Sequence, residues 1–352
     1  MLILQHPSLP SCSTELHIGE NLLAEKLLVD LCQKQRVVII ADAAVKDLYG
    51  TDLAKRLNAE LLTIPSGEKA KSKNTQENLE NELFKRGCDR DTILIALGGG
   101  VTTDLVGFVA SIYLRGVSLI LIPTTLLAMV DAAIGGKTAI NTDFGKNLIG
   151  TNYLPKAIIA DLKTLATLPE KEWLNGVAEI LKMGLVFDAS IWELAKKNSK
   201  SQELILKAIQ AKMDVVEQDP TEQGLRRILN FGHTIGHALE KIAHYEMSHG
   251  EAVAIGCLAE SHLSMHLGYL PEKEFEQIQS SYNLFSLKLP KNYTRQNLFM
   301  AMSHDKKKAQ GHIRFVLIDQ IGHALSFDGH YCCAITEKQL EATLDWMEKN
   351  YG

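Results

Sequence analysis

The sequence predicts an α/β N-terminal domain with a Rossmann-like parallel sheet, followed by a mostly α-helical C-terminal domain. The first observation is length, because 352 residues are too many for one ordinary hydrophobic core. The second is a regular alternation of strand-like and helix-like segments through the first half of the chain. The third is a change near Pro169, after which long helical patterns dominate. We therefore place the two domains at residues 1–168 and 169–352.

Short apolar runs alternate with amphipathic helical patterns from Arg36 onward. Strands are predicted at 36–42, 61–65, 92–97 and 117–122, and helices at 43–58, 74–86 and 103–112. Most of the strand segments are apolar throughout rather than at every second position. Such strands are buried on both faces, which is typical of a parallel sheet covered by helices on each side.

The second half of the chain carries five long helical patterns. They cover residues 170–186, 201–218, 225–242, 251–267 and 337–349, and one strand-like segment interrupts them at 313–318. Leu168-Pro169 precedes the first of these helices, and proline is common at a helix start. This pattern predicts a mostly helical second domain.

The composition indicates a packed globular protein and argues against several functional classes. Apolar residues make up 46% of the chain and charged residues 22%, with a net charge of −5 and no long basic run, so nucleic acid is not expected as a main partner. A run of 18 apolar residues is absent, and the N-terminus lacks the features of a signal peptide, so no membrane span or secretion is expected. Six cysteines without a C-x-x-C pair are typical of reduced thiols in a cytosolic protein.

A glycine-rich turn lies where the strand at 92–97 meets the next helix. The segment LGGGVTTDLVG, at 97–107, combines glycines that let the backbone approach a ligand with a helix start that offers N–H groups to phosphate oxygens. It departs from the G-x-G-x-x-G dinucleotide fingerprint because Thr103 occupies the third glycine position. Phosphate or dinucleotide binding and a tight turn without a ligand both remain open.

Two further polar features follow strands of the predicted sheet. Asp42 ends one strand, where an acidic side chain could accept a hydrogen bond from a ribose hydroxyl. The charged loop at 66–72 follows the next strand, at the edge where open α/β sheets bind ligands. Both features are also common on solvated surfaces, so neither identifies a site by itself.

A long glycine-rich connection follows the strand at 117–122. It contains Lys137, Lys146 and Asn147, and it keeps apolar residues that argue against disorder. Lysine provides a compact positive charge for phosphate. We favour an anion-binding site here over a surface loop with incidental lysines.

Four of the twelve histidines lie between His233 and His249. His233 and His237 are four residues apart, so on a helix they share one face. Neutral imidazoles at this spacing suit a divalent metal, and Glu179 could complete a set that holds Zn²⁺ with an open position. His233, His237 and His249 compete for the ligand positions, whereas His244 lies on a different helical face and is interpreted as a surface residue.

Basic and amide side chains precede this cluster in the sequence. Arg226 and Asn230 lie on the same predicted helix as His233, where a guanidinium on the metal-site face would attract a substrate carboxylate. Lys212 lies on the preceding predicted helix. These residues extend the hypothesis from a metal site to a site for an anionic substrate.

Two further charged groups have simpler explanations. Glu179 and Lys182 share a helical face and form either a surface ion pair or, given their apolar neighbours, a partly buried one. The segment HDKKK at 304–308 precedes the strand-like stretch, and in isolation a run of lysines is usually solvated charge.

Taken together, these segments resemble the 3-dehydroquinate synthase family of sugar phosphate cyclases. The matching motifs are SGEKAKS, GGGVTTDLVGF, YLRGV, IPTTLLAMVDAAIGGKTAIN, GKNLIG, NGVAEILK, LNFGHTIGHALE, SHGEAVAIG and HDKKKAQGHIRFVL. They run in chain order from about residue 66 to residue 317. Several are weak alone, but as a set they are highly specific.

The resemblance implies an NAD- and metal-dependent homodimeric enzyme whose active site lies in the cleft between an NAD-binding domain and a metal- and substrate-binding domain. Its substrate would be 3-deoxy-D-arabino-heptulosonate 7-phosphate, and its products would be 3-dehydroquinate and phosphate, in the shikimate pathway to aromatic amino acids. The reaction would combine transient oxidation by NAD⁺, β-elimination of phosphate, re-reduction, ring opening and intramolecular aldol closure.

Site residues are carried over from the resemblance motif by motif. The metal ligands would be Glu179, His233 and His249, holding Zn²⁺ or Co²⁺. Arg115 would reach the phosphate bound by the neighbouring subunit. The residues implied for catalysis and substrate binding are Lys137, Lys182, His237, Asp131, Asn230, Lys212, Arg226, Lys146, Asn147, Arg115 and Lys306. Those implied for the nucleotide are Asp42, Ser66, Gly67, Glu68, Lys69, Lys71, Gly99, Gly100, Val101, Thr102, Thr103, Asp104, Thr124, Thr125, Lys137, Lys146, Thr164 and Thr167.

The chain departs from the family pattern at four positions. Met129 stands where a Gln is common, Ala132 and Ala133 replace small hydroxyl residues, and Ala44 occupies the place of an Asn that often helps to bind the nucleotide. These differences concern individual cofactor contacts and leave the expected reaction class unchanged.

Three other functions compete with this reading. One is a sugar phosphate cyclase that acts on glucose 6-phosphate or sedoheptulose 7-phosphate. The segment from Gly135 to Thr138 and the pair of Arg226 and Lys212 argue against it, because they favour a substrate with a carboxylate. The second is a metal-dependent polyol dehydrogenase, which would release NADH. The third is a non-catalytic sensor of metal or nucleotide, which the density of charged residues at matching positions argues against.

Overall fold

The structure, a computed structural model, describes residues 2–6, 9–244, 246–306 and 313–352. The chain divides into two compact units, Met1–Trp173 and Leu174–Gly352. The described part of the first unit contains a seven-stranded sheet in the order β1-β2-β9-β6-β5-β3-β4. Its strands are β1 (Leu2–His6), β2 (Leu9–Gly19), β3 (Val37–Asp42), β4 (Glu60–Ile64), β5 (Ile93–Gly98), β6 (Ser118–Pro123) and β9 (Ala157–Asp161). Strands β1 and β2 pair antiparallel, and the other pairs are parallel.

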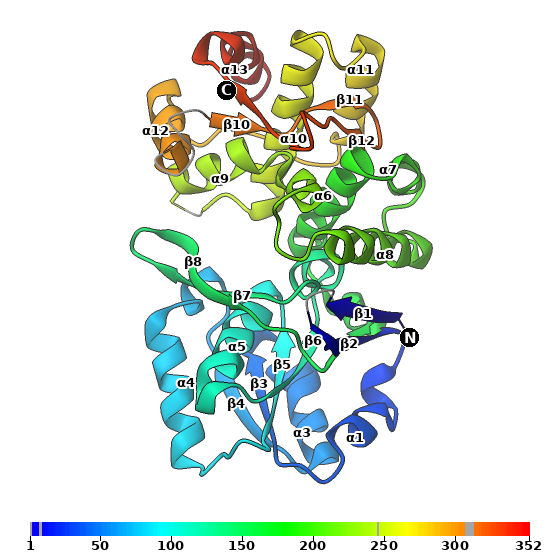
Figure 1. Cartoon of the computed structure of the whole chain (residues 1–352), viewed down its shortest axis with the longest axis vertical. Helices are drawn as coiled ribbons and strands as arrows, with labels where there is room; N and C mark the ends of the chain where they lie inside the picture. The colour runs from blue at the N-terminus through cyan, green and yellow to red at the C-terminus, as the bar shows by residue number, and fades with distance from the viewer. Residues whose placement is uncertain (1, 7–8, 245, 307–312) are drawn as a thin grey trace. The chain divides into compact units, whose positions relative to one another are not determined.

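Helices lie on both faces of this sheet, as Figure 1 shows. Helices α1 (Leu27–Cys32) and α3 (Thr51–Leu57) share one apolar cluster with the odd-numbered residues of β3 and β5. Helix α5 (Gly100–Ile112) packs against β5 and β6, with α4 (Lys73–Lys85) beside it on the other side of the sheet. A short helical run also covers Ala43–Val45 and Lys46–Gly50 ahead of α3. The predicted strands and helices of this half are therefore confirmed to within three residues at each end.

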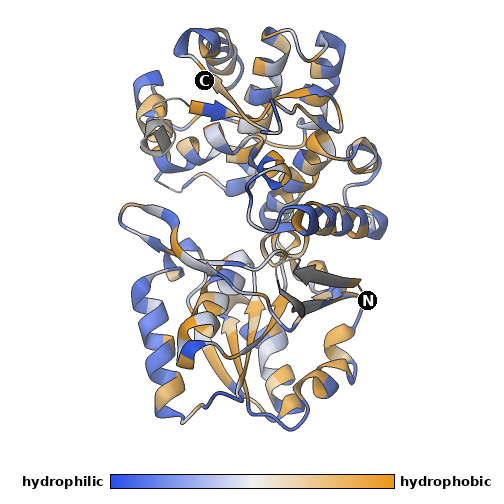
Figure 2. Cartoon of the chain, viewed as in Figure 1, coloured by the Kyte–Doolittle hydropathy of each residue, from blue (hydrophilic) through white to orange (hydrophobic). Residues whose placement is uncertain are grey.

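The central strands are apolar on both faces because both faces are covered. Figure 2 shows them as hydrophobic ribbons, while the flanking helices carry hydrophilic residues. Residues 38–41 of β3 and 93–97 of β5 have no solvent exposure. This burial explains why their sequences lack the alternation of a half-exposed strand.

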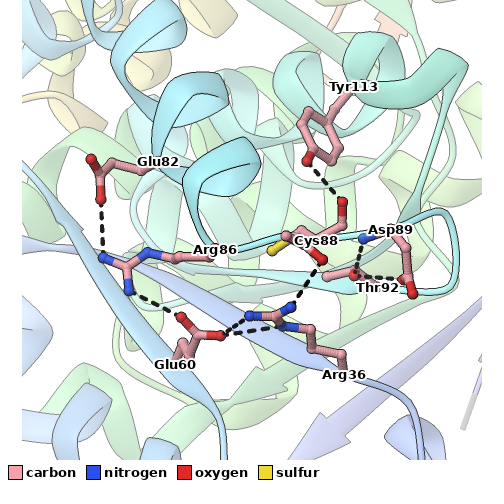
Figure 3. Close-up of polar contacts among 9 residues, drawn as sticks. Arg36, Glu60, Glu82, Arg86, Cys88, Asp89, Thr92 and Tyr113 are labelled. Carbon is pink, nitrogen blue, oxygen red and sulfur yellow. Dashed lines mark hydrogen bonds and ion pairs between the residues drawn. The ribbon is translucent and has the colours of Figure 1, made fainter.

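A network of charged side chains lies at the amino ends of β3 and β4 (Figure 3). Glu60 accepts hydrogen bonds from Arg36 and, at 3.0 Å, from Arg86, and Arg86 also donates to Glu82 at 3.0 Å. The hydrogen bond from Arg36 holds the pKa of Glu60 below its usual range. Because the pairs are exposed to solvent, they contribute little to stability. These pairs lie at the amino ends of the strands, whereas the predicted nucleotide-binding residues follow the carboxyl ends.

The connection after β6 is more ordered than the sequence predicted. It forms a π-helical turn at Ala128–Ala132 and then a hairpin of β7 (Lys137–Thr142) and β8 (Gly145–Asn152). Strand β7 lies against α5, where a Cβ added to Gly107 would come within 2.6 Å of Thr138 Cγ2. The sequence analysis identified the long polar connection but not its two strands, because the tertiary contact that stabilises the hairpin is not visible in composition.

The second unit is mostly helical, as predicted. Its helices, beginning with one that crosses the boundary, are α6 (Glu170–Val186), α7 (Ala189–Lys197), α8 (Gln202–Gln218), α9 (His233–Ile242), α10 (His249–His266), α11 (Glu272–Ser281), α12 (Arg295–Lys306) and α13 (Glu337–Tyr351). The single strand predicted at 313–318 was wrong. The segment is divided between β10 (Ile313–Phe315) and β11 (Ile318–Gln320), which pair with β13 (Cys333–Ile335) and β12 (His323–Ala324).

The single helix predicted over 225–242 was also wrong. A 3₁₀ turn covers Leu225–Asn230, and Gly232 then adopts a left-handed conformation with φ of 77° before α9 begins. Arg226 and Asn230 therefore do not share a helix with His233. Apolar periodicity continues across the break, so the sequence pattern alone did not reveal it.

Helices α9, α10, α12 and α13 enclose one apolar core together with β10 and β13. At its margin, His262 of α10 is only 8% exposed and stacks on Trp346 with ring centroids 4.9 Å apart. Its Nδ1 atom lies 3.1 Å from the hydroxyl of Thr343. Burial lowers the pKa of His262 to about 4.

We predict that this histidine makes the protein less stable in mild acid. The unfolded chain takes up a proton near the ordinary histidine pKa of 6.5, whereas the folded chain does so only near 4. Its contribution is therefore present above pH 6.5 and decreases by up to about 3 kcal/mol as the pH falls to 4. Urea unfolding between pH 7 and pH 4 should show a shallower pH dependence in His262→Gln than in His330→Gln, an exposed control. Equal pH dependences would contradict the prediction.

Candidate metal and nucleotide sites

Glu179, His233 and His249 come together in the second unit. Each offers one ligand atom, and these atoms lie within 4.8 Å of one another. Glu179 Oε1 is 3.1 Å from His249 Nε2 and 3.4 Å from His233 Nε2. Two imidazole nitrogens and one carboxylate oxygen are a donor set that suits Zn²⁺ or Co²⁺. The residues therefore fit a divalent cation.

Both imidazoles are oriented so that Nε2 faces Glu179. His233 Nδ1 lies 3.1 Å from the carbonyl oxygen of Phe231, and His249 Nδ1 lies 3.6 Å from Glu240 Oε1. An oxygen partner for the second ring nitrogen is the usual arrangement in metal sites, because it fixes the tautomer and leaves the other nitrogen to bind the ion.

The glycines of α9 and α10 bring the two histidines together. A Cβ added to Gly256 would lie 1.9 Å from the carbonyl oxygen of Gly232, and one added to Gly232 would lie 2.5 Å from Cys257 Sγ. One turn farther along α9, a Cβ on Gly236 would be 3.1 Å from the Ala252 carbonyl oxygen. The backbones of the two helices therefore touch directly. The start of α9, whose first residue is His233, lies against α10 at this contact.

The start of α10 is fixed by its own contacts. Ser248 and Glu251 form a capping box, so the Glu251 carboxylate is used by the helix start. The N–H of Gly250 donates to the Asn175 side chain at 2.8 Å, and a Cβ on Gly250 would come within 2.6 Å of Asn175 Cα. Asn175 lies one turn before Glu179 on α6, so this contact holds the start of α10, and with it His249, beside Glu179.

Lys182 is buried beside Glu179 and forms an ion pair with its second carboxylate oxygen. Both side chains are 2% exposed, so the alternative of a surface ion pair is wrong. Burial raises the pKa of Glu179, but Lys182 and the two histidines overcome this effect and hold the pKa well below its usual range. The carboxylate is therefore ionised and available as a ligand.

The two histidines differ in charge when no cation is bound. Burial and the Lys182 charge hold the pKa of His233 well below its usual range. Burial also opposes the charging of His249, but hydrogen bonds to Glu179 and Glu240 raise its pKa to about 10. A cation that binds here therefore takes the place of a proton on His249.

His237 lies beside the cluster on the next turn of α9. Its ring centroid is 4.9 Å from that of His233 and 6.5 Å from that of His249. Among the described residues, the three-residue cluster contains His233 and His249 but not His237. His233 and His249 are therefore the candidate ligands of the three competing histidines. His244 is exposed just after α9, as interpreted.

The predicted carboxylate-binding residues lie on two different elements. Lys212 is buried on α8, and Arg226 is buried in the 3₁₀ turn, where its side chain donates to the Pro220 carbonyl oxygen at 2.9 Å. Asp219 shapes this turn by accepting from three backbone amides, among them that of Arg226 at 3.0 Å. Asn230 is exposed and donates to Glu222 at 2.7 Å.

In the first unit, the glycine-rich turn between β5 and α5 presents bare backbone. A Cβ on Gly98 would come within 2.5 Å of Thr102 Oγ1, and one on Gly99 within 3.0 Å of Thr125 Cγ2. Gly99 is the N-cap of α5 and supplies no side chain to its first amides. The turn therefore has the form of a phosphate-binding helix start, and these residues fit a dinucleotide.

A hydrogen-bonded network joins the loop at 66–72 to the β7–β8 hairpin. Lys71, only 4% exposed, donates to Asp104 and to Asn147. Asn141 donates to Glu68 at 2.7 Å and accepts from the Asn147 amide at 3.0 Å. Burial raises the pKa of Asp104, and Lys71 opposes this rise. Four predicted residues thus meet in one place, and the sequence reading missed Asn141, which connects them.

The remaining predicted nucleotide residues are more scattered. Asp42 accepts from the Ala44 amide at 2.8 Å and from Ser66, so part of this carboxylate is already used within the chain. Thr164 is buried and donates to the Asp161 carbonyl oxygen at 2.8 Å, and Thr167 lies 2.6 Å from the hydroxyl of Tyr49. Gly67 and Lys69 lie on the exposed loop, and Val101, Thr102, Thr103, Thr124 and Thr125 surround the glycine turn.

The predicted phosphate-binding residues also have defined places. Lys137 begins β7 and is exposed, Lys146 and Asn147 lie in β8, and Asp131 lies in the π-helical turn. Arg115 is exposed after α5, in a turn with φ of 69°. Lys306 is the last residue of α12, its side chain lies outside the description, and Lys307 and Lys308 lie outside the described residues.

Glu240 and Asn175 were not identified from the sequence. Glu240 is buried on α9 and approaches His249 Nδ1, while Asn175 accepts from Gly250. Both lie inside motifs that contain ligands, next to residues with an evident role. The sequence signal that could have identified Glu240 was an acidic residue seven positions after His233, because helical spacing places it two turns farther along the same face.

The fold and the two sites define a class: two-unit enzymes that combine a nucleotide-binding sheet with a helical metal-binding unit. Models of the N-terminal and C-terminal parts of 3-dehydroquinate synthase match residues 61–175 and 176–308. The 3-dehydroquinate synthase of Thermodesulfovibrio yellowstonii is 41% identical over 319 residues, which cover 86% of this chain and 89% of that relative. The chain belongs to the 3-dehydroquinate synthase family.

Two solved structures share the whole architecture. The 2-epi-5-epi-valiolone synthase ValA from Streptomyces hygroscopicus, with NAD⁺ and Zn²⁺ bound, is 31% identical with a TM-score of 0.87, covering 96% of this chain and 97% of that one. A 2-deoxy-scyllo-inosose synthase complexed with carbaglucose-6-phosphate, NAD⁺ and Co²⁺ is 25% identical with a TM-score of 0.87, covering 95% and 97%. The predicted fold class is therefore confirmed.

We predict that His233→Ala removes the ability to retain zinc, because two ligands remain where three are needed. Zinc content after dialysis against metal-free buffer, measured by atomic emission, should fall from about one ion per chain to near zero. The exposed His244→Ala is the matched control and should keep its zinc. Unchanged zinc in His233→Ala would show that the ligand assignment is wrong.

Proposed function

We propose that the chain converts 3-deoxy-D-arabino-heptulosonate 7-phosphate to 3-dehydroquinate and phosphate, as a carbon–oxygen lyase that uses NAD⁺ and a divalent cation. The observation that carries this proposal is the convergence of Glu179, His233 and His249 in a chain that both family models match. The shikimate pathway to aromatic amino acids is the corresponding biosynthetic role. We assign nucleotide binding to residues 1–168 and metal and substrate binding to 169–352.

Two cofactors supply chemistry that side chains cannot. When bound, NAD⁺ accepts and returns a hydride, and the divalent cation is a Lewis acid that acidifies the substrate hydroxyl. Solved relatives contain NAD⁺ with Zn²⁺ or with Co²⁺. In this chain the cation would be held by Glu179, His233 and His249, and the nucleotide by the glycine turn and the network around Lys71.

The side chains around the metal cluster have distinct tasks. Lys182 keeps Glu179 ionised and so maintains a negative ligand in a buried place. His237 is close enough to the cluster to accept or donate a proton there, with its ring 4.9 Å from that of His233. Glu179 is buried, whereas His233 and His249 are partly exposed, so the cluster is open on the side of the imidazoles.

The anionic ends of the substrate require cations. Arg226 and Lys212 are both buried and would face the carboxylate, for which the planar guanidinium of Arg226 offers a bidentate contact. Lys137, Lys146 and Lys306 would bind the phosphate, with Asn147 and Asn230 as hydrogen-bond donors. Asp131 would line the centre, and Arg115 would reach the phosphate site of a second subunit in a cytoplasmic homodimer.

A second candidate is another sugar phosphate cyclase, because both solved relatives belong to that group. Greater sequence identity favours the heptulosonate reaction: 41% to the 3-dehydroquinate synthase of T. yellowstonii, against 31% and 25% to the two other cyclases. The buried pair of Lys212 and Arg226 adds a reason to expect a substrate with a carboxylate.

None of the helices in the described ranges has the length and apolar character needed to cross a membrane. This agrees with the absence of a long apolar run in the sequence.

We predict that phosphate release from the heptulosonate phosphate requires both NAD⁺ and a divalent cation, with no net formation of NADH. Phosphate can be followed by a colorimetric assay, with absorbance at 340 nm recorded in parallel. Chelation should reduce the rate at least about 100-fold, since a catalytic metal contributes several kcal/mol. Glucose 6-phosphate and sedoheptulose 7-phosphate serve as comparison substrates.

Each rival predicts a different result in the same assay. Stoichiometric NADH would identify a polyol dehydrogenase. Faster phosphate release from either comparison substrate would identify a different cyclase, and no turnover of any sugar phosphate would leave only a binding function.

A further inference from the structure

Glu260 is a buried carboxylate that the metal cluster and the proposed reaction do not use. It lies on α10, eleven residues after His249, and has no solvent exposure. Burial raises its pKa to about 8, although the backbone amides of Gly232, Ile235 and Thr234 and the charge of Lys182 oppose that rise. Neither of its carboxyl oxygens has a hydrogen-bond partner within the described residues.

These amides belong to the start of α9, which has no cap of its own. Its N-cap residue is Gly232, which has no side chain, and no acidic residue occurs in its first turn. The first N–H groups of a helix need an acceptor, and a negative charge near them is stabilising. Glu260 lies one helical turn after Gly256 on α10, so it is on the face of α10 that packs against Gly232 at the start of α9. The amides of this helix start are among the groups that oppose the rise in its pKa. Glu260 therefore takes the place that an N-cap side chain would occupy.

His233 is the first residue of α9, so whatever holds this turn also holds that imidazole. His233 Nδ1 is directed to the Phe231 carbonyl oxygen, which lies in the same turn. A rotation of the turn would move Nε2 relative to Glu179 Oε1, from which it is now 3.4 Å away. The geometry of the metal cluster thus depends on the backbone at 231–235.

We propose that Glu260 is a positioning residue of the metal centre: its carboxyl group holds the first turn of α9, and with it His233, in the orientation that binds a divalent cation. This role rests on the proposed function only in requiring that the cluster binds such a cation. In this role Glu260 acts through the helix start and is not itself a ligand of the cation.

The test is Co²⁺ binding by the full-length chain after removal of metal with EDTA, followed by visible absorption. In Glu260→Gln the side chain keeps its size and replaces one acceptor oxygen by an NH₂ group, which cannot accept a hydrogen bond from the amides of α9. We expect Co²⁺ affinity to fall 10- to 100-fold, as is typical when a partner of a metal ligand is lost. The absorption bands at saturating Co²⁺ should shift, because the His233 ligand is misplaced, while the circular dichroism of the metal-free variant stays unchanged.

Ser261→Ala is the matched control. Ser261 is equally buried on α10, and its hydroxyl donates to the Cys257 carbonyl oxygen at 2.7 Å within its own helix. It should bind Co²⁺ with wild-type affinity and spectrum. If Glu260→Gln does likewise, the proposal is overturned.

A variant that fails to fold does not prevent the test. Glu260→Asp keeps both carboxyl oxygens and shortens their reach, so weaker Co²⁺ binding by a folded Asp variant supports the positioning role, and wild-type binding overturns it. A wild-type protein that binds no Co²⁺ would instead contradict the proposed function, which distinguishes the two failures.

Discussion

The direct contact of two helix backbones is the constraint on which the metal cluster depends. Helices α9 and α10 touch through Gly232, Gly236 and Gly256, and any side chain at Gly256 would occupy the position of the Gly232 carbonyl oxygen. Because the helices approach so closely, the first residue of α9 and the first residue of α10 both reach Glu179 on α6. The chemistry of the site is therefore set by positions that carry no functional group.

Compensated charge is the second feature that the site requires. Glu179 would not stay ionised in an apolar interior by itself, because burial raises its pKa. Lys182 and the two histidines reverse that effect, and Glu240 stabilises the charge of His249. Breaking one partner of such a set leaves an uncompensated charge, which is why single substitutions here are expected to be severe.

The sheet was predictable from the sequence because each central strand is buried on both faces and so appears as an unbroken apolar run. The β7–β8 hairpin was missed, since its order comes from packing against α5, a contact between distant segments. The break before His233 was missed for a similar reason: Gly232 looks like any helical glycine until its left-handed φ is known.

The candidate site was predictable in its ligands and less so in its surroundings. Glu179, His233 and His249 stand in recognisable motifs, and the structure brings them together. The roles of Glu240 and Glu260 were not recognisable from the sequence, because they arise only where α9 and α10 meet. Spacing along one helix identifies a shared face, but it cannot identify which face of another helix lies opposite.

The most direct measurement of the central claim is X-ray diffraction from crystals of the zinc-bound protein, collected on both sides of the zinc absorption edge. The account predicts one anomalous peak bonded to a carboxylate oxygen of Glu179 and to Nε2 of both His233 and His249, at about 2.0–2.2 Å. A peak bonded to other residues, or no peak at this cluster in a zinc-loaded crystal, would contradict it.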